Sequence, residues 1–259
     1  MVSFVLLAGG VAGIAAIDRL HKIHPEKIAG IVWYGEESDR PKSVDDNLYI
    51  DLKAALSLAD ALLCSGYGDI IDAATIAAFP RGCFNAHPSL LPAYRGRHAI
   101  QWAIAEGEKT LGVTVHRMTE TIDHGEIIRS ASRCFEITTG LDEIVFCLAE
   151  LAADLLVEFV ETDLPRSSLA MTGTTPNKAT YHRRRRPTDS RINWHADGGS
   201  VIARLRASGP NYPAYSKTAE GEIITFDHYL ASDVPGTVLY VSEDGCLIST
   251  GGGGVVWLK

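Results

Sequence analysis

The stretch Asn85–Gly96, NAHPSLLPAYRG, begins with an amide and an imidazole two residues apart. The apolar run Gly82–His87 predicts a strand, and on an extended backbone the side chains of Asn85 and His87 point to the same face. An amide can donate a hydrogen bond to an oxyanion, and an imidazole can carry a proton. These two abilities are what acyl transfer requires, so the strand ends in a candidate catalytic pair.

A second motif, Ile122–Gly125 (IDHG), places a carboxylate, Asp123, in a predicted turn. A buried carboxylate beside an imidazole orients the ring and favours its protonated form. Asn85, His87 and Asp123 are therefore the catalytic candidates. Most of the 9 histidines, His116 among them, are expected to be structural, because a single histidine near an apolar strand is usually a packed one.

Apolar and amphipathic runs alternate around this motif. Strands are predicted over Val2–Ala8, Lys27–Tyr34, Ala61–Ser65 and Gly82–His87, and helices over Ala12–Ile23 and Asp72–Phe79. Continuous apolar strands separated by helices predict a Rossmann-like α/β fold with a mostly parallel sheet covered on both faces. Such sheets bind ligands at the carboxyl ends of their strands, which is where the catalytic pair lies.

The rest of the chain divides into a scaffold and a smaller region. After the motif we expect a helix over Ala99–Ala105, strands over Val113–Met118 and Glu126–Ile137, and a long helix following Thr139. Short glycine-punctuated strands then predict a small β-rich C-terminal region. The predicted domains are a catalytic domain over 1–165, a linker over 166–190 and the β-rich region over 191–259. The basic run Arg183–Arg186 is expected to be a solvated part of the linker.

Composition narrows the function classes. The chain has 259 residues, a net charge of -8 and a pI of about 5.6, which disfavours a protein built to bind a polyanion. Its 5 cysteines are scattered, which predicts reduced thiols and no metal site. The apolar start Val2–Ala16 lacks the basic residues of a signal peptide, and no run reaches a membrane-spanning length. A cytoplasmic enzyme without a membrane partner is expected.

Asn-x-His-x-Ser-Leu-Leu-Pro-x-Tyr-Arg-Gly, followed by an Asp before a Gly, resembles the folate-dependent formyltransferases. The resemblance is strongest over residues 60–130 and visible again over Pro187–His195. It implies transfer of a formyl group from N10-formyltetrahydrofolate to a primary amine. It also implies that Asn85, His87 and Asp123 form the triad of that family.

The same resemblance predicts where the folate binds. The segment Ser65–Ile71 is similar to the family segment whose backbone pairs with the pterin, with a second segment opposite it. The implied folate-binding residues are Gly68, Asp69, Ile70, Ile71, Thr121 and Ile122. Taken on its own, a glycine-containing segment after a strand permits close ligand approach, or it is a simple turn into the next helix.

The acceptor contacts are predicted from phosphate chemistry. The segment Gly9–Gly13 does not match Gly-x-Gly-x-x-Gly, and no acidic residue ends the second strand, so an NAD site is not expected. A helix N-terminus at Gly10 suits a phosphate, and Arg97 is a second phosphate candidate. Tyr94 and His98 complete the predicted substrate contacts.

The C-terminal region bears on which amine is formylated. Residues 191–259 hold five Lys and Arg against seven Asp and Glu, a poor surface for tRNA. The predicted acceptor is a nucleotide-linked amino sugar, such as GDP-perosamine, in surface polysaccharide (O-antigen) synthesis, with no nucleic acid partner and a homodimer as the expected assembly. The alternatives are a methionyl-tRNA formyltransferase, a hydroxyamino-acid formyltransferase of siderophore synthesis, a formyltetrahydrofolate hydrolase, and a non-catalytic folate- or nucleotide-binding module.

Overall fold

The computed structural model describes residues 2–162, 164, 178–193, 195–217, 223–226, 238–242, 245–251 and 254–258. The chain forms two compact units, the first made of Met1–Arg95, Gly112–Ser132 and Val145–Tyr181, the second of Gly96–Leu111, Arg133–Ile144 and His182–Lys259. The units interleave along the chain, and each is described by itself. The sequence-based boundaries at 165 and 190 stay a prediction. Among the described helices, none is long and apolar enough to span a membrane.

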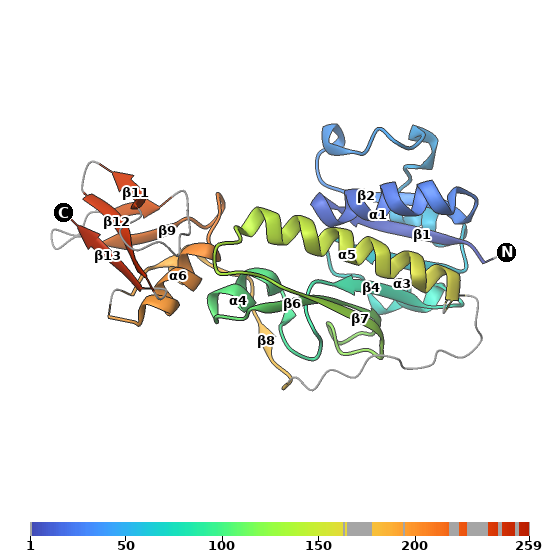
Figure 1. Ribbon diagram of the computed structural model, residues 1–259. Helices are drawn as coiled ribbons and strands as arrows, with labels where there is room; N and C mark the ends of the chain where they lie inside the picture. Colours follow the sequence, from blue (N-terminus) through green and yellow to red (C-terminus); the bar gives the residue numbers. More distant parts are fainter. Residues whose placement is uncertain are drawn as a thin grey trace. The chain divides into compact units, whose positions relative to one another are not determined.

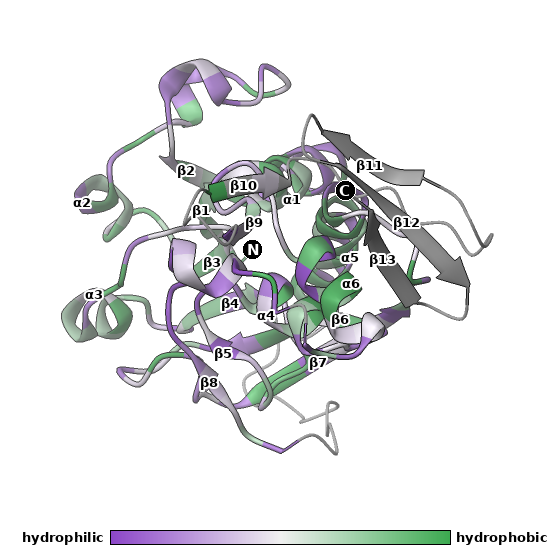
Figure 2. Ribbon diagram, turned by 90° about the vertical axis from the view of Figure 1, so that its left-hand side faces the viewer, coloured by the Kyte–Doolittle hydropathy of each residue, from purple (hydrophilic) through white to green (hydrophobic). Residues whose placement is uncertain are grey.

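The helices and strands follow one another along the chain, and most of them are labelled in Figure 1 and the others in Figure 2. They are β1 (Phe4–Gly9), α1 (Gly10–Ile23), β2 (Ile28–Tyr34), α2 (Leu52–Ala55), β3 (Ala61–Ser65), α3 (Ala73–Ala78), β4 (Cys83–His87), β5 (Arg95–Gly96), α4 (Ala99–Ala105), β6 (Thr110–Arg117), β7 (Ile127–Cys134), α5 (Leu141–Thr162), β8 (Tyr181–His182), α6 (Gly198–Arg206), β9 (Ala214–Lys217), β10 (Ile223–Phe226), β11 (Val238–Ser242), β12 (Gly245–Gly251) and β13 (Gly254–Leu258). The predicted bounds of β3 and α4 are confirmed to the residue, and β7 is shorter than expected.

The first unit is built on a six-stranded sheet of order β2-β1-β3-β4-β6-β7. Strand β1 runs parallel to β2 and β3, and β3 runs parallel to β4, whereas β4 and β6 are antiparallel. The predicted α/β class with a mostly parallel sheet is confirmed. Because the chain passes from β2 back across β1 to β3, the strand order reverses between β1 and β3, which is the ligand-binding position of such sheets.

Burial explains why these residues form this sheet. Strand β1 is buried along its whole length, as expected for an uninterrupted apolar run covered on both faces. Helices α2 and α3 lie on one face, and α1 and α5 lie on the other (Figure 2). The small residues Ala15, Ala149 and Ala153 pack together where α1 meets α5. The sheet is thus packed on both faces, and its strand ends are suitable for holding a precise site.

The carboxyl ends of β1 and β3 approach each other through glycines. Gly66 has a φ of +73°, and a Cβ there would lie 2.1 Å from the carbonyl oxygen of Gly9. Only a residue without a side chain fits this position, because the conformation and the contact both exclude one. The two backbones therefore meet directly at the position where the strand order reverses.

The second unit contains the expected β strands of the C-terminal region. It also contains a helix, α6, that the sequence did not indicate. The expected strands appear as β10 to β13, with β9 and β10 paired antiparallel and β11, β12 and β13 forming a second antiparallel sheet. The glycine run Gly251–Gly254, whose composition is typical of a turn, lies partly outside the described residues. Helix α6 begins with two glycines, a loop-like signal, but Asp197 accepts a hydrogen bond from the Ser200 amide at 2.9 Å and caps it.

The prediction that the basic run is solvated is wrong for Arg185, whose side chain is buried. Its guanidinium donates to the carbonyl oxygen of Ala207 and, at 3.0 Å, to the hydroxyl of Ser190. Arg183 in turn forms two 2.7 Å bonds with the carboxylate of Asp189. Arginine presents several fixed donors, so it can organise the carbonyl groups of a connection that has little regular structure.

Candidate active site

Strand β4 positions the predicted catalytic pair at its carboxyl end. The imidazole of His87 is buried, and the amide of Asn85 is half-buried. Both side chains point to one face of the sheet because they alternate with the buried residues Phe84 and Ala86. The strand therefore offers a buried proton-carrying group beside an amide that is partly accessible.

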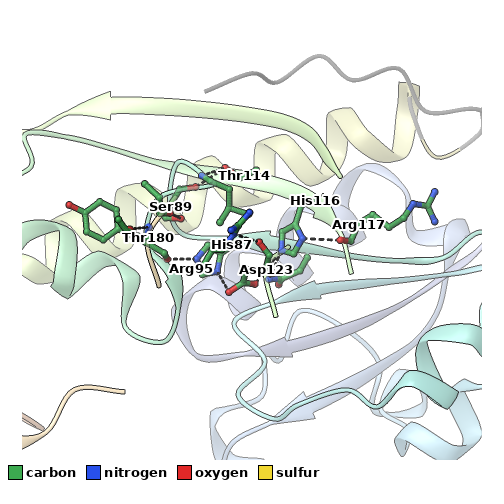
Figure 3. Close-up of polar contacts among 12 residues, drawn as sticks. His87, Ser89, Arg95, Thr114, His116, Arg117, Asp123 and Thr180 are labelled. Carbon is green, nitrogen blue, oxygen red and sulfur yellow. Dashed lines mark hydrogen bonds and ion pairs between the residues drawn. The ribbon is translucent and has the colours of Figure 1, made fainter. Parts of the chain in front are cut away.

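The Ser-Leu-Leu-Pro segment after His87 is held by a buried hydroxyl pair (Figure 3). The Ser89 hydroxyl donates to the carbonyl oxygen of Ala93 at 2.7 Å, and the Thr114 hydroxyl donates to the carbonyl oxygen of Ser89 at 2.7 Å. The amide of Leu91 also donates to Thr114, at 3.1 Å. This part of the motif is structural, since it fixes the turn that brings Tyr94 back toward His87.

The ring of His87 has one nitrogen committed to the backbone. Its Nε2 lies 2.9 Å from the carbonyl oxygen of Tyr94, which can only accept, so Nε2 carries a hydrogen. The other nitrogen, Nδ1, lies 3.6 Å from Oδ2 of Asp123. Tyr94 is in turn anchored by its amide, which donates to the Thr180 hydroxyl at 2.8 Å. Nδ1 is therefore the nitrogen that can take up a proton.

Backbone strain concentrates on predicted site residues. Among the described residues, the non-glycine residues with positive φ are Tyr94 (57°), His98 (60°) and Asp123 (55°). This left-handed conformation costs a non-glycine residue on the order of 1 kcal/mol or more and is found preferentially at functional sites. The carbonyl oxygen of Asp123 accepts a 2.9 Å bond from Nε of Arg95, which helps hold the turn.

Burial sets the charge of His87. Burial is the largest influence and lowers the pKa of the ring, and it outweighs the carboxylate of Asp123, which raises it. The carboxylate favours the protonated ring, as expected, and burial, which the sequence does not reveal, opposes it more strongly. At neutral pH His87 is an uncharged imidazole with a lone pair on Nδ1.

A further histidine, His116, belongs to this cluster and was not predicted to. Its Nε2 lies 3.4 Å from Oδ1 of Asp123 and 3.3 Å from Nδ2 of Asn85, and its side chain is buried. It stands on β6 directly opposite Asn85 in the antiparallel register with β4. Its apolar strand context offered no signal, because the pairing of the two strands is not visible in a single sequence.

The predicted folate-binding segments lie in the same unit as the catalytic cluster. Ile70 and Ile122, one from each segment, are exposed apolar side chains, at 71% and 42%. Asp69 and Thr121 are exposed as well, and Ile71 is buried. At Gly68 a Cβ would lie 2.4 Å from the ring of Tyr34, so a larger residue there would have to displace that ring. Large exposed apolar side chains beside a polar cluster are typical of a binding surface.

The predicted acceptor contacts fall in both units. Gly10 is the exposed first residue of α1, with a φ of +56°. Tyr94 belongs to the first unit, as described above, and Arg97 and His98 belong to the second. The pKa of His98 is lowered by burial first, then by the positive charges of three nearby arginines, Arg184, Arg185 and Arg97. The described residues contain no group of side chains that could hold a metal ion.

An amide donor and an imidazole on β4, with a carboxylate from the turn between β6 and β7, form a site suited to acyl transfer. A model of the formyl transferase family matches residues 22–158 of the chain, and a model of the formyl transferase C-terminal domain matches residues 185–259. The protein belongs to the formyl transferase family.

Solved structures with the same fold include several N-formyltransferases. An N-formyltransferase from Helicobacter canadensis, determined with folinic acid and dTDP-3-aminofucose, is 17% identical, with 99% of this chain and 98% of that chain covered and a TM-score of 0.70. A 4-N formyltransferase from Francisella tularensis is 17% identical, with 89% and 98% covered and a TM-score of 0.69. Rv3404c from Mycobacterium tuberculosis is 20% identical, with 91% and 100% covered and a TM-score of 0.70. At these identities the likeness shows the fold.

Proposed function

We propose that this protein transfers a formyl group from N10-formyltetrahydrofolate to the amine of a nucleotide-linked amino sugar. The observation that carries the proposal is that Nδ1 of the buried His87 lies 3.6 Å from the carboxylate of Asp123, with the half-buried Asn85 on the same face of the strand; burial also lowers the pKa of His87. His87 supplies a proton acceptor, Asp123 a stabilising negative charge, and Asn85 a hydrogen-bond donor to the oxyanion.

Each residue has a definite task in this reaction. As the amine nitrogen bonds to the formyl carbon, negative charge develops on the formyl oxygen, and an N–H of Asn85 donates to it. Nδ1 of His87 takes up the proton that the amine loses, and Asp123 stabilises the imidazolium that forms. The bond between the formyl carbon and the donor nitrogen then breaks. That nitrogen receives the proton as it leaves, so His87 returns to its neutral form.

Donor binding is proposed at the two segments around Ile70 and Ile122. The folate-binding residues would be Gly68, Asp69, Ile70 and Ile71 on one side and Thr121 and Ile122 on the other. The exposed isoleucines support this assignment because an aromatic ring system would cover them. The Helicobacter canadensis enzyme of the same family was solved with folinic acid, a formyl-bearing folate.

The acceptor contacts we propose are Gly10, Tyr94, Arg97 and His98. Gly10 offers the N-terminus of α1 to a phosphate, and Arg97 offers a guanidinium. Residues 191–259 carry more acidic than basic side chains, which favours a small phosphate-bearing acceptor over a tRNA. The Helicobacter canadensis structure holds dTDP-3-aminofucose, a ligand of this class. For this chain we propose an amino sugar such as GDP-perosamine, a role in O-antigen synthesis, a cytoplasmic location and a homodimer.

The acceptor is tested by incubating the purified protein with N10-formyltetrahydrofolate and a panel of GDP-, dTDP- and UDP-linked amino sugars, with methionyl-tRNA in parallel. We expect one nucleotide sugar to gain the mass of a formyl group and the tRNA to gain none. Efficient formylation of the tRNA, with none of any sugar, would contradict the acceptor assignment. Transfer to no amine at all, with folate bound, would favour a non-catalytic binding module.

A further inference from the structure

His116 has a polar partner at each ring nitrogen. Its Nδ1 lies 3.0 Å from the carbonyl oxygen of Arg117, which can only accept, so a hydrogen bond there requires a hydrogen on Nδ1. Its Nε2 lies 3.3 Å from the amide nitrogen of Asn85, which can only donate, so a hydrogen bond there requires a lone pair on Nε2. Both bonds form together when the ring has its hydrogen on Nδ1.

This arrangement constrains Asn85. An asparagine amide can present either its nitrogen or its oxygen to a neighbour by rotating half a turn about its last side-chain bond. With a lone pair on Nε2 of His116, only the nitrogen of Asn85 fits there. The amide nitrogen has two hydrogens, and one of them is used by His116. The second stays available for another acceptor, and the half-buried position of Asn85 leaves it partly accessible.

From this geometry we propose that His116 is a positioning residue, which holds the Asn85 amide so that an N–H, and not the carbonyl oxygen, faces the reacting formyl oxygen. The inference rests on the proposed function, because it assigns that oxygen to Asn85. Without His116 the amide can turn over, and its own oxygen would then repel the negative charge that develops in the transition state.

Asp123 limits this role to a ring that has no hydrogen on Nε2. Its Oδ1 lies 3.4 Å from the same Nε2, and the ring of His87 stands edge-on with its centroid 6.3 Å from that of His116. If Nε2 gained a hydrogen, it would donate to the carboxylate and could no longer accept from Asn85. A hydrogen on Nε2 is therefore incompatible with this hold on the Asn85 amide.

Kinetics of two substitutions test the role. His116→Gln keeps an acceptor oxygen for the amide, whereas His116→Leu has none. We expect His116→Leu to lower kcat by roughly 10- to 100-fold, which is part of the loss seen when a hydrogen-bond donor to an oxyanion is removed. KM for both substrates should stay nearly unchanged. His116→Gln should have a kcat close to that of the wild type. Equal losses in both variants would overturn the proposal.

A double variant separates positioning from packing. If His116 acts through Asn85, then Asn85→Ala combined with His116→Leu is no slower than Asn85→Ala alone, whereas additive losses would overturn the proposal. Val115→Ala, at a buried neighbouring position whose side chain points to the other face, is the packing control. It should lower the melting temperature while kcat changes little.

The tautomer is testable without any substrate. ¹⁵N NMR of the histidine-labelled protein should show His116 with a hydrogen on Nδ1 and none on Nε2, the signal being identified by its loss in His116→Gln. A proton on Nε2, alone or together with Nδ1, would overturn the proposal whatever the activity. If the wild-type protein formylates no amine, the proposed function is refuted. The role of His116 in that reaction is then refuted as well.

Discussion

Nδ1 of His87 and Oδ2 of Asp123 lie 3.6 Å apart, with only 6% and 8% of the two side chains exposed. At this distance the carboxylate stabilises a proton on the ring, yet burial keeps the pKa of His87 below its ordinary value. Within this pair, His87 is thus a base that is uncharged at rest, and the carboxylate of Asp123 stabilises the proton that it takes up. This balance between burial and charge is what suits it to catalysis.

The lowered pKa of His87 predicts how stability depends on pH. As pH falls, the unfolded chain binds a proton at about 6.5 before the folded ring does, so the free energy of unfolding falls as the pH drops from about 6.5 through the folded pKa. His87→Gln lacks this group, so its stability should decline less than that of the wild type below about pH 6.5. Urea unfolding at a series of pH values measures both curves, and parallel curves would contradict the direction of the shift.

The carboxylate of Asp123 should be needed for turnover and not for folding. Asp123→Asn removes the charge, and asparagine tolerates the left-handed backbone of this position. We expect kcat to fall by about 100-fold or more, because the proton on His87 is no longer stabilised, while the melting temperature stays near that of the wild type. His124→Ala, at the exposed next residue of the same turn, serves as the matched control with little change in kcat. A nearly unchanged rate for Asp123→Asn would remove Asp123 from the mechanism.

Gly66 should be among the least replaceable glycines. An alanine there would be strained at φ +73° and would place its Cβ 2.1 Å from the carbonyl oxygen of Gly9, a backbone atom that cannot move aside. We expect Gly66→Ala to cost more than about 2 kcal/mol in unfolding free energy. Gly107 also has a positive φ, +87°, but nothing lies within 4 Å of the position that a Cβ would take there. Gly107→Ala should therefore cost only about 1 kcal/mol, and equal losses from denaturant unfolding would contradict the close approach of β1 and β3.

Arg185 should be a stability residue despite its place in a basic run. Arg185→Ala removes the donors to the Ala207 carbonyl and the Ser190 hydroxyl and leaves a cavity, so we expect a loss of roughly 2 to 4 kcal/mol. The adjacent exposed Arg184 offers a control, since Arg184→Ala should change the unfolding free energy by less than about 0.5 kcal/mol. Two variants with the same stability would mean that Arg185 is solvated, as the sequence alone suggested.

Local patterns in the sequence were enough for most of the sheet and its helices. β3 and α4 coincide with the predicted runs because unbroken apolar stretches and helical spacing are local signals. The triad candidates were also visible. Asn85 and His87 stand two residues apart on one strand, and Asp123 lies in the downstream IDHG motif. Helix α6 was missed because its two leading glycines resemble a loop, and its cap at Asp197 did not outweigh them.

What the sequence by itself determined is the α/β order of the chain, the candidate triad and the family resemblance, all of which follow from residues close together along the chain. Only the tertiary structure decided that His116 faces Asn85, that burial outweighs the Asp123 charge at His87, and that Arg185 is buried. Strand register, desolvation and burial depend on contacts between segments that are far apart in the sequence. The sequence alone does not show which of these segments are in contact.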